Sequence, residues 1–223
     1  SNQGARERPA WLATESLRLH VGCGPTRLAG WTHCDLYDGA GIDHVFDLQS
    51  RWPFPDNSAS EVYGSHVLEH LRDPLAFFRE AWRVLQPNAV MLLRVPYGGH
   101  RAAWWDLEHQ RPWFAESFAI LQPGYAESIR NPQHAGLGHP WCVQNVNMRL
   151  SAKAARLIRW RLLRRWLVPW LDLLPDFCEE LWIYLYALKS EDAVANFLAT
   201  RQPNTVPVQY VAYHHHLAGR LLG

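Results

Sequence analysis

A short glycine turn follows the first apolar segment of the chain, and it is the first place where the sequence could bind a ligand. Residues 17–21 read LRLHV, and Gly22-Cys23-Gly24-Pro25 comes directly after them. Glycine lets the backbone adopt unusual conformations and lets a ligand approach the main chain closely. A strand that runs into such a turn at the carboxyl edge of a parallel sheet commonly binds a nucleotide-like ligand. An ordinary structural turn explains the same residues, so the motif alone leaves both interpretations open.

Two carboxylates are expected at the same edge. Asp35 closes the strand-like segment 31–36, and Asp47 follows the segment 42–46. An acidic side chain at the end of the second strand can accept hydrogen bonds from the hydroxyls of a ribose. Asp47, together with Leu48, is placed to meet an adenine ring. Each carboxylate could instead cap a turn.

The spacing of these groups departs from a dinucleotide fingerprint. Thr26 and Arg27 stand where a third glycine would be expected, and Asp35 lies only eleven residues beyond Gly24. In a dinucleotide-binding fold a full crossover helix places the acidic residue about twenty residues further on. The first helix must therefore be abbreviated, and the spacing disfavours a NAD-linked enzyme.

The elements that must position these groups follow from hydrophobic patterning. Short strand-like runs alternate with helical ones, which predicts an α/β fold with a mostly parallel sheet. We expect strands over residues 17–21, 31–36, 42–46, 61–65, 89–95, 143–150 and 181–188. Asp73 and Pro74 should open a helix, as N-cap and first helical residue, that ends at 86–88. Ser151 should cap a second helix that reaches about Leu167.

Composition supports a folded globular protein. The 223 residues are 48% hydrophobic and 19% charged, with a net charge of +1, which excludes wholesale disorder and gives no reason to expect a polyanionic partner. The longest apolar run, residues 166–171, is far too short to span a membrane. The four cysteines are scattered without a CxxC pair, which favours reduced thiols. We therefore expect a cytoplasmic protein.

Several motifs in order carry a resemblance to a known family. The chain reads LHVGCGPTRLAGWTHCDL and then FDLQSRWPFPDNSASEVYGSHVLEHLRDPLAFFREAWRVLQPNAVMLLRVP. It resembles class I S-adenosylmethionine-dependent methyltransferases of the type-11-like group over residues 15–97. The shared landmarks are the GCGP turn, the Gly-Trp before the second strand, the acidic end of that strand, PFPD, His-x-Leu-Glu-His and Leu-x-Pro.

The resemblance implies a fold and a domain organisation. The expected fold is a Rossmann-like, mostly parallel seven-stranded sheet with an antiparallel last strand, helices on both faces and a helical insertion before the last strand. The methyltransferase domain would cover residues 1–190, with the insertion at about 151–179. Residues 191–223 would be a C-terminal extension packed on it.

The resemblance also implies the cofactor, S-adenosylmethionine, with S-adenosylhomocysteine as product. The family's cofactor-binding positions fall on Gly22, Cys23, Gly24, Asp35, Asp47, Leu48, Ser65 and His66. The glycine turn would face the methionine moiety, Asp35 the ribose, Asp47 with Leu48 the adenine, and Ser65 with His66 the sulfonium.

Methyl transfer itself needs alignment of a nucleophile with the S–CH₃ bond and exclusion of water. A hydroxyl or acid acceptor also needs a base, and histidine suits neutral pH. The candidates in the irregular stretch after residue 97 are His100, His109, His134 and His139. We favour His109, since DLEHQRPWFAESFAIL resembles a segment of some family members, with His66 as a second catalytic candidate. Any of these could instead be a buried structural histidine.

Five aromatic residues could line the acceptor pocket or pack in the core. They are Tyr97, Trp104, Trp105, Trp113 and Trp141.

Residues 66–70 also match the inverted zinc-protease pattern HxxEH. Zinc would need both histidines on one helix face together with a third ligand. The segment instead begins at a strand end, and a new helix opens at Asp73, so we expect no metal.

The acceptor is less well defined by the sequence. The motifs for methylation of DNA amino groups and of cytosine C5 are absent. Residues 149–165 contain seven basic residues and no acidic one, which fits either a solvated helix face or a phosphate-bearing partner. We expect methyl transfer to a hydroxyl, carboxyl or amine of an unidentified small-molecule or glycan-type acceptor. The alternatives are a non-catalytic binding or assembly module with this fold and, second, a NAD-linked oxidoreductase.

Overall fold

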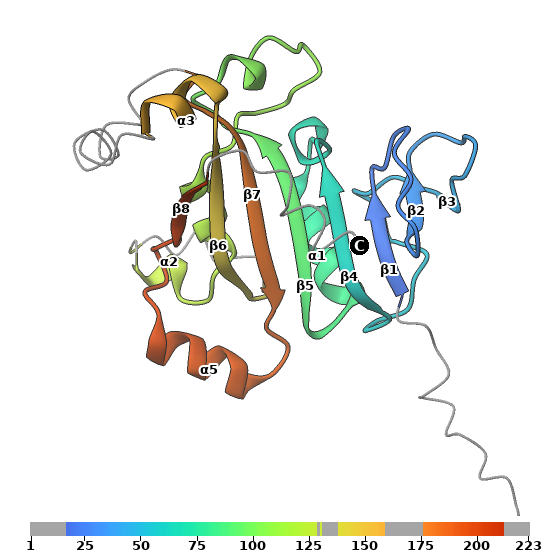
Figure 1. Ribbon diagram of the computed structural model, residues 1–223. Helices are drawn as coiled ribbons and strands as arrows, with labels where there is room; N and C mark the ends of the chain where they lie inside the picture. Colours follow the sequence, from blue (N-terminus) through green and yellow to red (C-terminus); the bar gives the residue numbers. More distant parts are fainter. Residues whose placement is uncertain (1–16, 129, 131–137, 159–175, 212–223) are drawn as a thin grey trace, which may run out of the picture.

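One twisted sheet of eight strands forms the centre of the computed structural model, which describes residues 17–128, 130, 138–158 and 176–211 (Figure 1). The strands lie in the order β3-β2-β1-β4-β5-β7-β6-β8. Their bounds are β1 (Leu17–Val21), β2 (Thr32–Asp35), β3 (His44–Val45), β4 (Ala59–Ser65), β5 (Leu85–Pro96), β6 (Trp141–Leu150), β7 (Cys178–Ala187) and β8 (Val208–Val211).

The first five strands are parallel, so their carboxyl ends meet at one edge of the sheet. β7 runs antiparallel between β5 and β6 and places Glu180 opposite Pro96 at that edge. The predicted mostly parallel sheet with an antiparallel strand, β7, is thus confirmed. The expected number of strands was one too low, because β8 adds to β6 beyond the hairpin. Its four residues follow Pro207 and are too few to show a period in the sequence.

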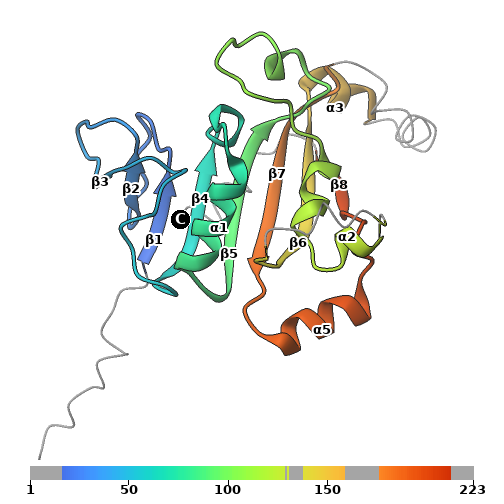
Figure 2. The ribbon, with the colours of Figure 1, turned by 180° about the vertical axis from the view of Figure 1, so that it is seen from behind.

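Helix α1 (Pro74–Val84) packs against one face of the sheet (Figure 2). The Asp73 carboxylate accepts a hydrogen bond from the Ala76 amide at 3.0 Å, which confirms the predicted cap. Phe77, Phe78 and their neighbours on one side of the helix are buried against the sheet. β5 begins directly at Leu85, so residues 86–88, expected to end the helix, already belong to the strand.

The other helical elements are short. They are the 3-10 helices η2 (Leu68–His70), η3 (Arg101–Ala103) and η4 (Ala115–Leu121), and the α-helices α2 (Tyr125–Ser128), α3 (Ala152–Ile158) and α5 (Glu191–Thr200). Figure 1 shows α3 and α5 at opposite ends of the sheet. Ser151 Oγ accepts from the Ala154 amide at 3.3 Å, as expected for the start of α3. The predicted continuation to Leu167 lies outside the described residues. Among the described helices, none combines the length and the apolar character needed to cross a bilayer.

No helix intervenes between β1 and β2, whose linking residues 22–31 are all described and form turns. The crossover that normally separates the first glycine turn from the second-strand acid is therefore reduced to a loop. This brings the carboxyl ends of β1 and β2 together over a short stretch of sequence.

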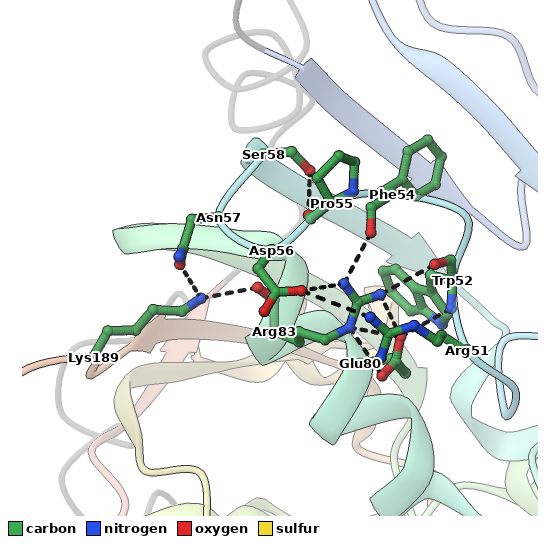
Figure 3. Close-up of polar contacts among 10 residues, drawn as sticks. All are labelled: Arg51, Trp52, Phe54, Pro55, Asp56, Asn57, Ser58, Glu80, Arg83 and Lys189. Atoms are coloured by element: carbon green, nitrogen blue, oxygen red, sulfur yellow. Dashed lines mark hydrogen bonds and ion pairs between the residues drawn. The ribbon is translucent and has the colours of Figure 1, made fainter.

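A polar network fixes the loop that leads from β3 to β4 (Figure 3). The Arg83 guanidinium of α1 donates to the Phe54 carbonyl at 2.9 Å and to the Asp56 carboxylate at 2.7 Å. It also pairs with Glu80 one turn earlier, at 2.6 Å. Lys189 donates to Asn57 Oδ1 at 2.6 Å. The PFPD landmark is thus a structural anchor that holds residues 51–58 against α1.

Candidate functional site

The glycine turn at the end of β1 combines close packing with open space. Gly22 and Gly24 both have positive φ, +58° and +50°. A Cβ atom on Gly22 would lie 2.4 Å from Cγ2 of Val67, in the turn that follows β4. A Cβ atom on Gly24 would meet no other heavy atom within 4 Å. The first glycine therefore packs the two strand ends together, and the second leaves room beside the backbone.

Asp35 closes this turn from the neighbouring strand. Its Oδ2 accepts from the Gly24 amide at 2.8 Å, and its Oδ1 accepts from the Leu36 and Tyr37 amides at 2.8 and 3.3 Å. An ionised carboxylate offers about four acceptor positions. Three are used here by backbone amides, and the remaining contact is with the Cys23 thiol, a weak donor that a ligand hydroxyl would displace.

Arg27 takes the place of the missing third glycine. Its guanidinium donates to the carbonyls of Gly24 and Thr26 at 2.7 and 2.9 Å, and to the Ala40 carbonyl across the site at 2.7 Å. The sequence analysis missed this role. The signal was a lone basic residue three positions beyond Gly24, which by itself is indistinguishable from a surface arginine.

Two of the side chains predicted to bind the cofactor are more buried than expected. The Cys23 and Leu48 side chains are buried in the protein, with 3% and 5% exposure. Their side chains are therefore not open to a ligand. Asp47 follows Phe46, whose amide donates to the Asp35 carbonyl at 3.0 Å, so it lies at the same edge. Its Oδ1 accepts from the Gln49 amide at 2.9 Å.

His66, directly after β4, has a left-handed backbone with φ +54°. Its Nε2 lies 2.8 Å from Oε1 of Glu180, and its Nδ1 lies 3.1 Å from Oε1 of Glu69. The hydrogen bond to Glu180, and then that to Glu69, raise the pKa of His66 to about 9. In this arrangement both ring nitrogens carry protons at neutral pH, so His66 can donate a hydrogen bond but not accept a proton.

Glu180 binds several cationic side chains at this end of the sheet. Its carboxylate accepts from Arg94 at 2.8 and 3.0 Å, from Arg149 at 3.0 Å and from the Trp182 indole at 2.9 Å. Burial opposes its ionisation, but the hydrogen bond from His66 and the charge of Arg94 outweigh burial and hold the pKa of Glu180 well below its usual range. Sequence analysis missed Glu180, because nothing in the local pattern of β7 marks it.

The basic stretch 149–165 is only partly described. Arg149 was expected on the basic helix. It lies instead at the end of β6, where it pairs with Glu180, so it does not contribute to a free basic face. Arg156 lies in the last turn of α3 and is exposed. Arg159, Arg161, Arg164 and Arg165 lie outside the described residues, as do His134 and the run His214-His215-His216.

A pocket of about 400 Å³ opens beside His66. Four histidines, His66, His70, His100 and His109, line it together with Glu69, Trp105 and further acidic residues. The segment after β5 forms its outer wall, where it rises beyond the upper end of that strand in Figure 1. His109, the favoured candidate, is thus brought next to His66, although 43 positions separate them in the sequence.

Backbone contacts hold this wall in place. The Gln110 amide donates to the Glu69 carbonyl at 2.8 Å, and Arg111 donates to the Arg72 carbonyl at 3.1 Å. Nδ1 of His109 lies 3.3 Å from the Ala103 carbonyl, and the rings of His70 and His109 meet edge-to-face at 4.8 Å. The 106–111 segment is therefore fixed against η2.

The remaining histidine and aromatic candidates divide into residues that line the pocket and residues that lie elsewhere. His139 packs edge-to-face on Trp82 and lies away from this pocket. Of the five aromatic candidates, Trp105 lines the pocket. Trp104 is exposed and bonds the Gly98 carbonyl at 2.8 Å. Tyr97, Trp113 and Trp141 are core residues, a correction to the proposed aromatic pocket that follows from their exposure of 6% or less.

A comparison with protein families finds one match on this chain. Residues 38–93 match the family described as methyltransferase domain, type 11. The matched segment runs from β3 through η2 and α1 into β5. Over these residues the chain is similar to that family.

Solved structures that resemble this chain share little sequence with it. The YcgJ protein of Bacillus subtilis is 13% identical, with a TM-score of 0.47, and the match covers 79% of this chain and 93% of that one. Phosphoethanolamine N-methyltransferase 2 of Haemonchus contortus, solved with S-adenosyl-L-methionine, is 13% identical, with a TM-score of 0.47 and coverage of 79% and 49%. The [4+2]-cyclase SpnF is 15% identical, with a TM-score of 0.49 and coverage of 80% and 78%. No curated protein matches the chain.

Proposed function

We propose that this protein transfers a methyl group from S-adenosylmethionine to a hydroxyl, carboxyl or amine of a small-molecule or glycan-type acceptor. The observation that carries the proposal is the match of residues 38–93 to a methyltransferase domain, whose strands share one sheet edge with the glycine turn and Asp35. That edge is where an α/β fold of this topology binds nucleotide-like ligands.

The proposed cofactor site uses the groups that converge there. The fourth acceptor position of Asp35 would receive a ribose hydroxyl in place of the Cys23 thiol, and the open space at Gly24 would admit the methionine moiety. Asp47 would lie at the adenine end, and Ser65, the last residue of β4, would lie near the sulfonium. Cys23 and Leu48 would contribute main-chain contacts.

The acceptor would enter the pocket beside His66. The reaction forms a bond from the acceptor nucleophile to the methyl carbon, breaks the carbon–sulfur bond and leaves neutral S-adenosylhomocysteine, while the acceptor gives up a proton. What the protein must supply is in-line alignment and a dry site. The imidazolium of His66 is held between two carboxylates and donates a hydrogen bond to each, so of the two catalytic candidates His109 is the one available as a base. Its role as base stays a prediction from the sequence.

Transfer of a labelled methyl group tests the proposal. The purified protein is incubated with tritiated S-adenosylmethionine and a panel of alcohols, carboxylic acids, amines and glycans. We expect label in the product of one acceptor class, and no label with a Gly22→Ala variant. If the protein binds S-adenosylhomocysteine but gives no product and no slow hydrolysis across the panel, the proposal is wrong and the non-catalytic alternative holds.

A further inference from the structure

Three side chains of the kinds that bind metal ions converge on one wall of the pocket. One potential ligand atom from each of Glu69, His70 and His109 lies within 4.8 Å of the other two. Ligand atoms on one zinc ion lie about 3 to 4 Å apart, because each is about 2.0–2.2 Å from the ion. Small side-chain rotations would close the difference.

The carboxylate of Glu69 has an unused oxygen where burial is nearly complete. Glu69 is 1% exposed, and its Oε2 has no hydrogen-bond partner among the described residues. Leaving a buried carboxylate oxygen unsatisfied costs on the order of 1–3 kcal/mol. A cation bound at this oxygen would remove that cost. Oε1, in contrast, is oriented by Nδ1 of His66.

The hydrogen bond of His109 fixes which nitrogen is available. Nδ1 faces the Ala103 carbonyl at 3.3 Å, and a carbonyl can only accept, so Nδ1 carries the proton. In the neutral ring Nε2 is then the nitrogen with the lone pair, and it lies 3.8 Å from Oδ2 of Asp106. A ring N–H that donates to a backbone carbonyl is the usual outer support of a metal-bound histidine.

The charges around the pocket also favour a cation. The lining residues include the carboxylates of Glu69, Asp106, Glu179 and Glu180. Arg149 and Arg94, both bonded to Glu180, offset part of this charge. A bound cation would offset more of it.

We propose that Glu69, His70 and His109 form a binding site for a divalent transition-metal ion, with Zn²⁺ as the first candidate. Two imidazoles and one carboxylate are a ligand set that such ions take, and three protein ligands leave a coordination position open toward the pocket. An acceptor oxygen bound there would lose its proton more readily. The site does not depend on the proposed methyl transfer. It does exclude His109 as a base, since both roles need the same lone pair.

Direct metal binding tests the proposal. The protein is stripped with a chelator and dialysed against Zn²⁺, and bound metal is counted. Co²⁺ then serves as a spectroscopic probe of nitrogen and oxygen ligation. All titrations use a background in which His214, His215 and His216 are changed to alanine, because a histidine run can bind metal by itself. We expect one ion per chain and a loss of affinity of more than about 100-fold in Glu69→Gln and His109→Gln, since even outer-support changes cost about 10- to 100-fold.

Two further variants keep the test decisive. His139→Gln removes a histidine that lies outside the pocket and should bind Zn²⁺ as the parent does. His66→Gln removes the group that orients Glu69, together with its contact to Glu180, and should weaken binding by about tenfold or more. Circular dichroism confirms that each variant is folded. Less than one ion bound by the folded parent, or equal affinity in the parent, Glu69→Gln and His109→Gln, would overturn the proposal.

Discussion

At the scale of single residues, the partners of each carboxylate decide what it can do. Asp35 is held by three backbone amides, and its fourth acceptor position, at the proposed cofactor site, meets the weakly donating Cys23 thiol. The carboxylate of Glu180 accepts hydrogen bonds from arginines, an indole and an imidazolium. It therefore holds these charged groups together and has little capacity left to bind a ligand. Sequence analysis identified Asp35 because it ends a recognisable strand. It missed Glu180 and the unused oxygen of Glu69, because only the folded chain shows which partners surround them.

His20 provides a prediction on pH dependence. It is 1% exposed in β1, and burial, followed by the charges of His33 and Arg27, lowers its pKa to about 4 from 6.5. The unfolded chain therefore binds a proton on His20 at a higher pH than the folded one does, so stability is full above pH 6.5 and falls as the pH drops toward 4. Between pH 7.5 and 5 this histidine should remove about 2 kcal/mol from the free energy of unfolding.

Urea unfolding at the two pH values measures this effect. The matched variant is His20→Phe, which keeps an aromatic ring beside Tyr63 and cannot titrate. Its loss of stability between pH 7.5 and 5 should be smaller than that of the parent by about 2 kcal/mol. An equal loss in both proteins would mean that His20 titrates normally in the folded state.

At the scale of elements, the end of β1 depends on its two glycines in different ways. Gly22→Ala combines a positive φ with a contact 2.4 Å from Val67, whereas Gly24→Ala meets only the backbone restriction. We expect Gly22→Ala to lower the free energy of unfolding by about 2–5 kcal/mol and Gly24→Ala by about 1–2 kcal/mol. Thermal unfolding of both variants gives the comparison.

A double variant separates strain from crowding. Val67→Ala removes Cγ2, the atom nearest to a new Cβ on Gly22, and leaves Cβ of residue 67 at 2.7 Å, so Gly22→Ala should cost less in that background without becoming free of strain. Additive effects of the two substitutions would show that the close packing of the turn against the end of β4 contributes nothing.

The network of Figure 3 makes a second prediction at this scale. The Arg83 side chain is 12% exposed and joins Glu80, Asp56 and the Phe54 carbonyl. Arg83→Met should lower the free energy of unfolding by about 2–4 kcal/mol, because Glu80 would be left with little compensation. Arg79 of the same helix is the control, since its contact with Asp73 is long, at 3.6 Å, and exposed. Arg79→Met should change stability by less than about 1 kcal/mol in urea unfolding, and equal effects would contradict the assigned role of the network.

At the scale of the whole molecule, the sequence predicts the sheet better than its surroundings. β1 is predicted to the residue, and the hairpin of β6 and β7 within a few positions, because apolar patterning marks strands that pack on a core. β8 and the pocket could not be predicted from the sequence, and the reason is the same for both. Each depends on contacts between distant segments, such as that of the 106–111 segment with η2, which no local pattern encodes.

The arrangement of the whole site follows from this architecture. Gly22 packs on Val67 of the turn 65–70, and His66, Glu69 and His70 of the same turn line the histidine-rich pocket. One short segment after β4 thus borders both the proposed cofactor side and the proposed acceptor side. The central claim is that the cofactor side binds S-adenosylmethionine and its product.

Calorimetric titration of S-adenosylhomocysteine tests that claim most directly. We expect binding near a micromolar dissociation constant for the parent and a loss of about 10- to 100-fold in Asp35→Asn, as for a charged hydrogen bond worth about 1.5–3 kcal/mol. Asp38→Asn is the matched control, because Asp38 lies in the same exposed loop and bonds only the Gly39 amide, at 2.8 Å. Absence of binding by the folded parent, or equal affinity in Asp35→Asn and Asp38→Asn, would contradict the account. Binding of NAD⁺ in its place would point to the oxidoreductase alternative.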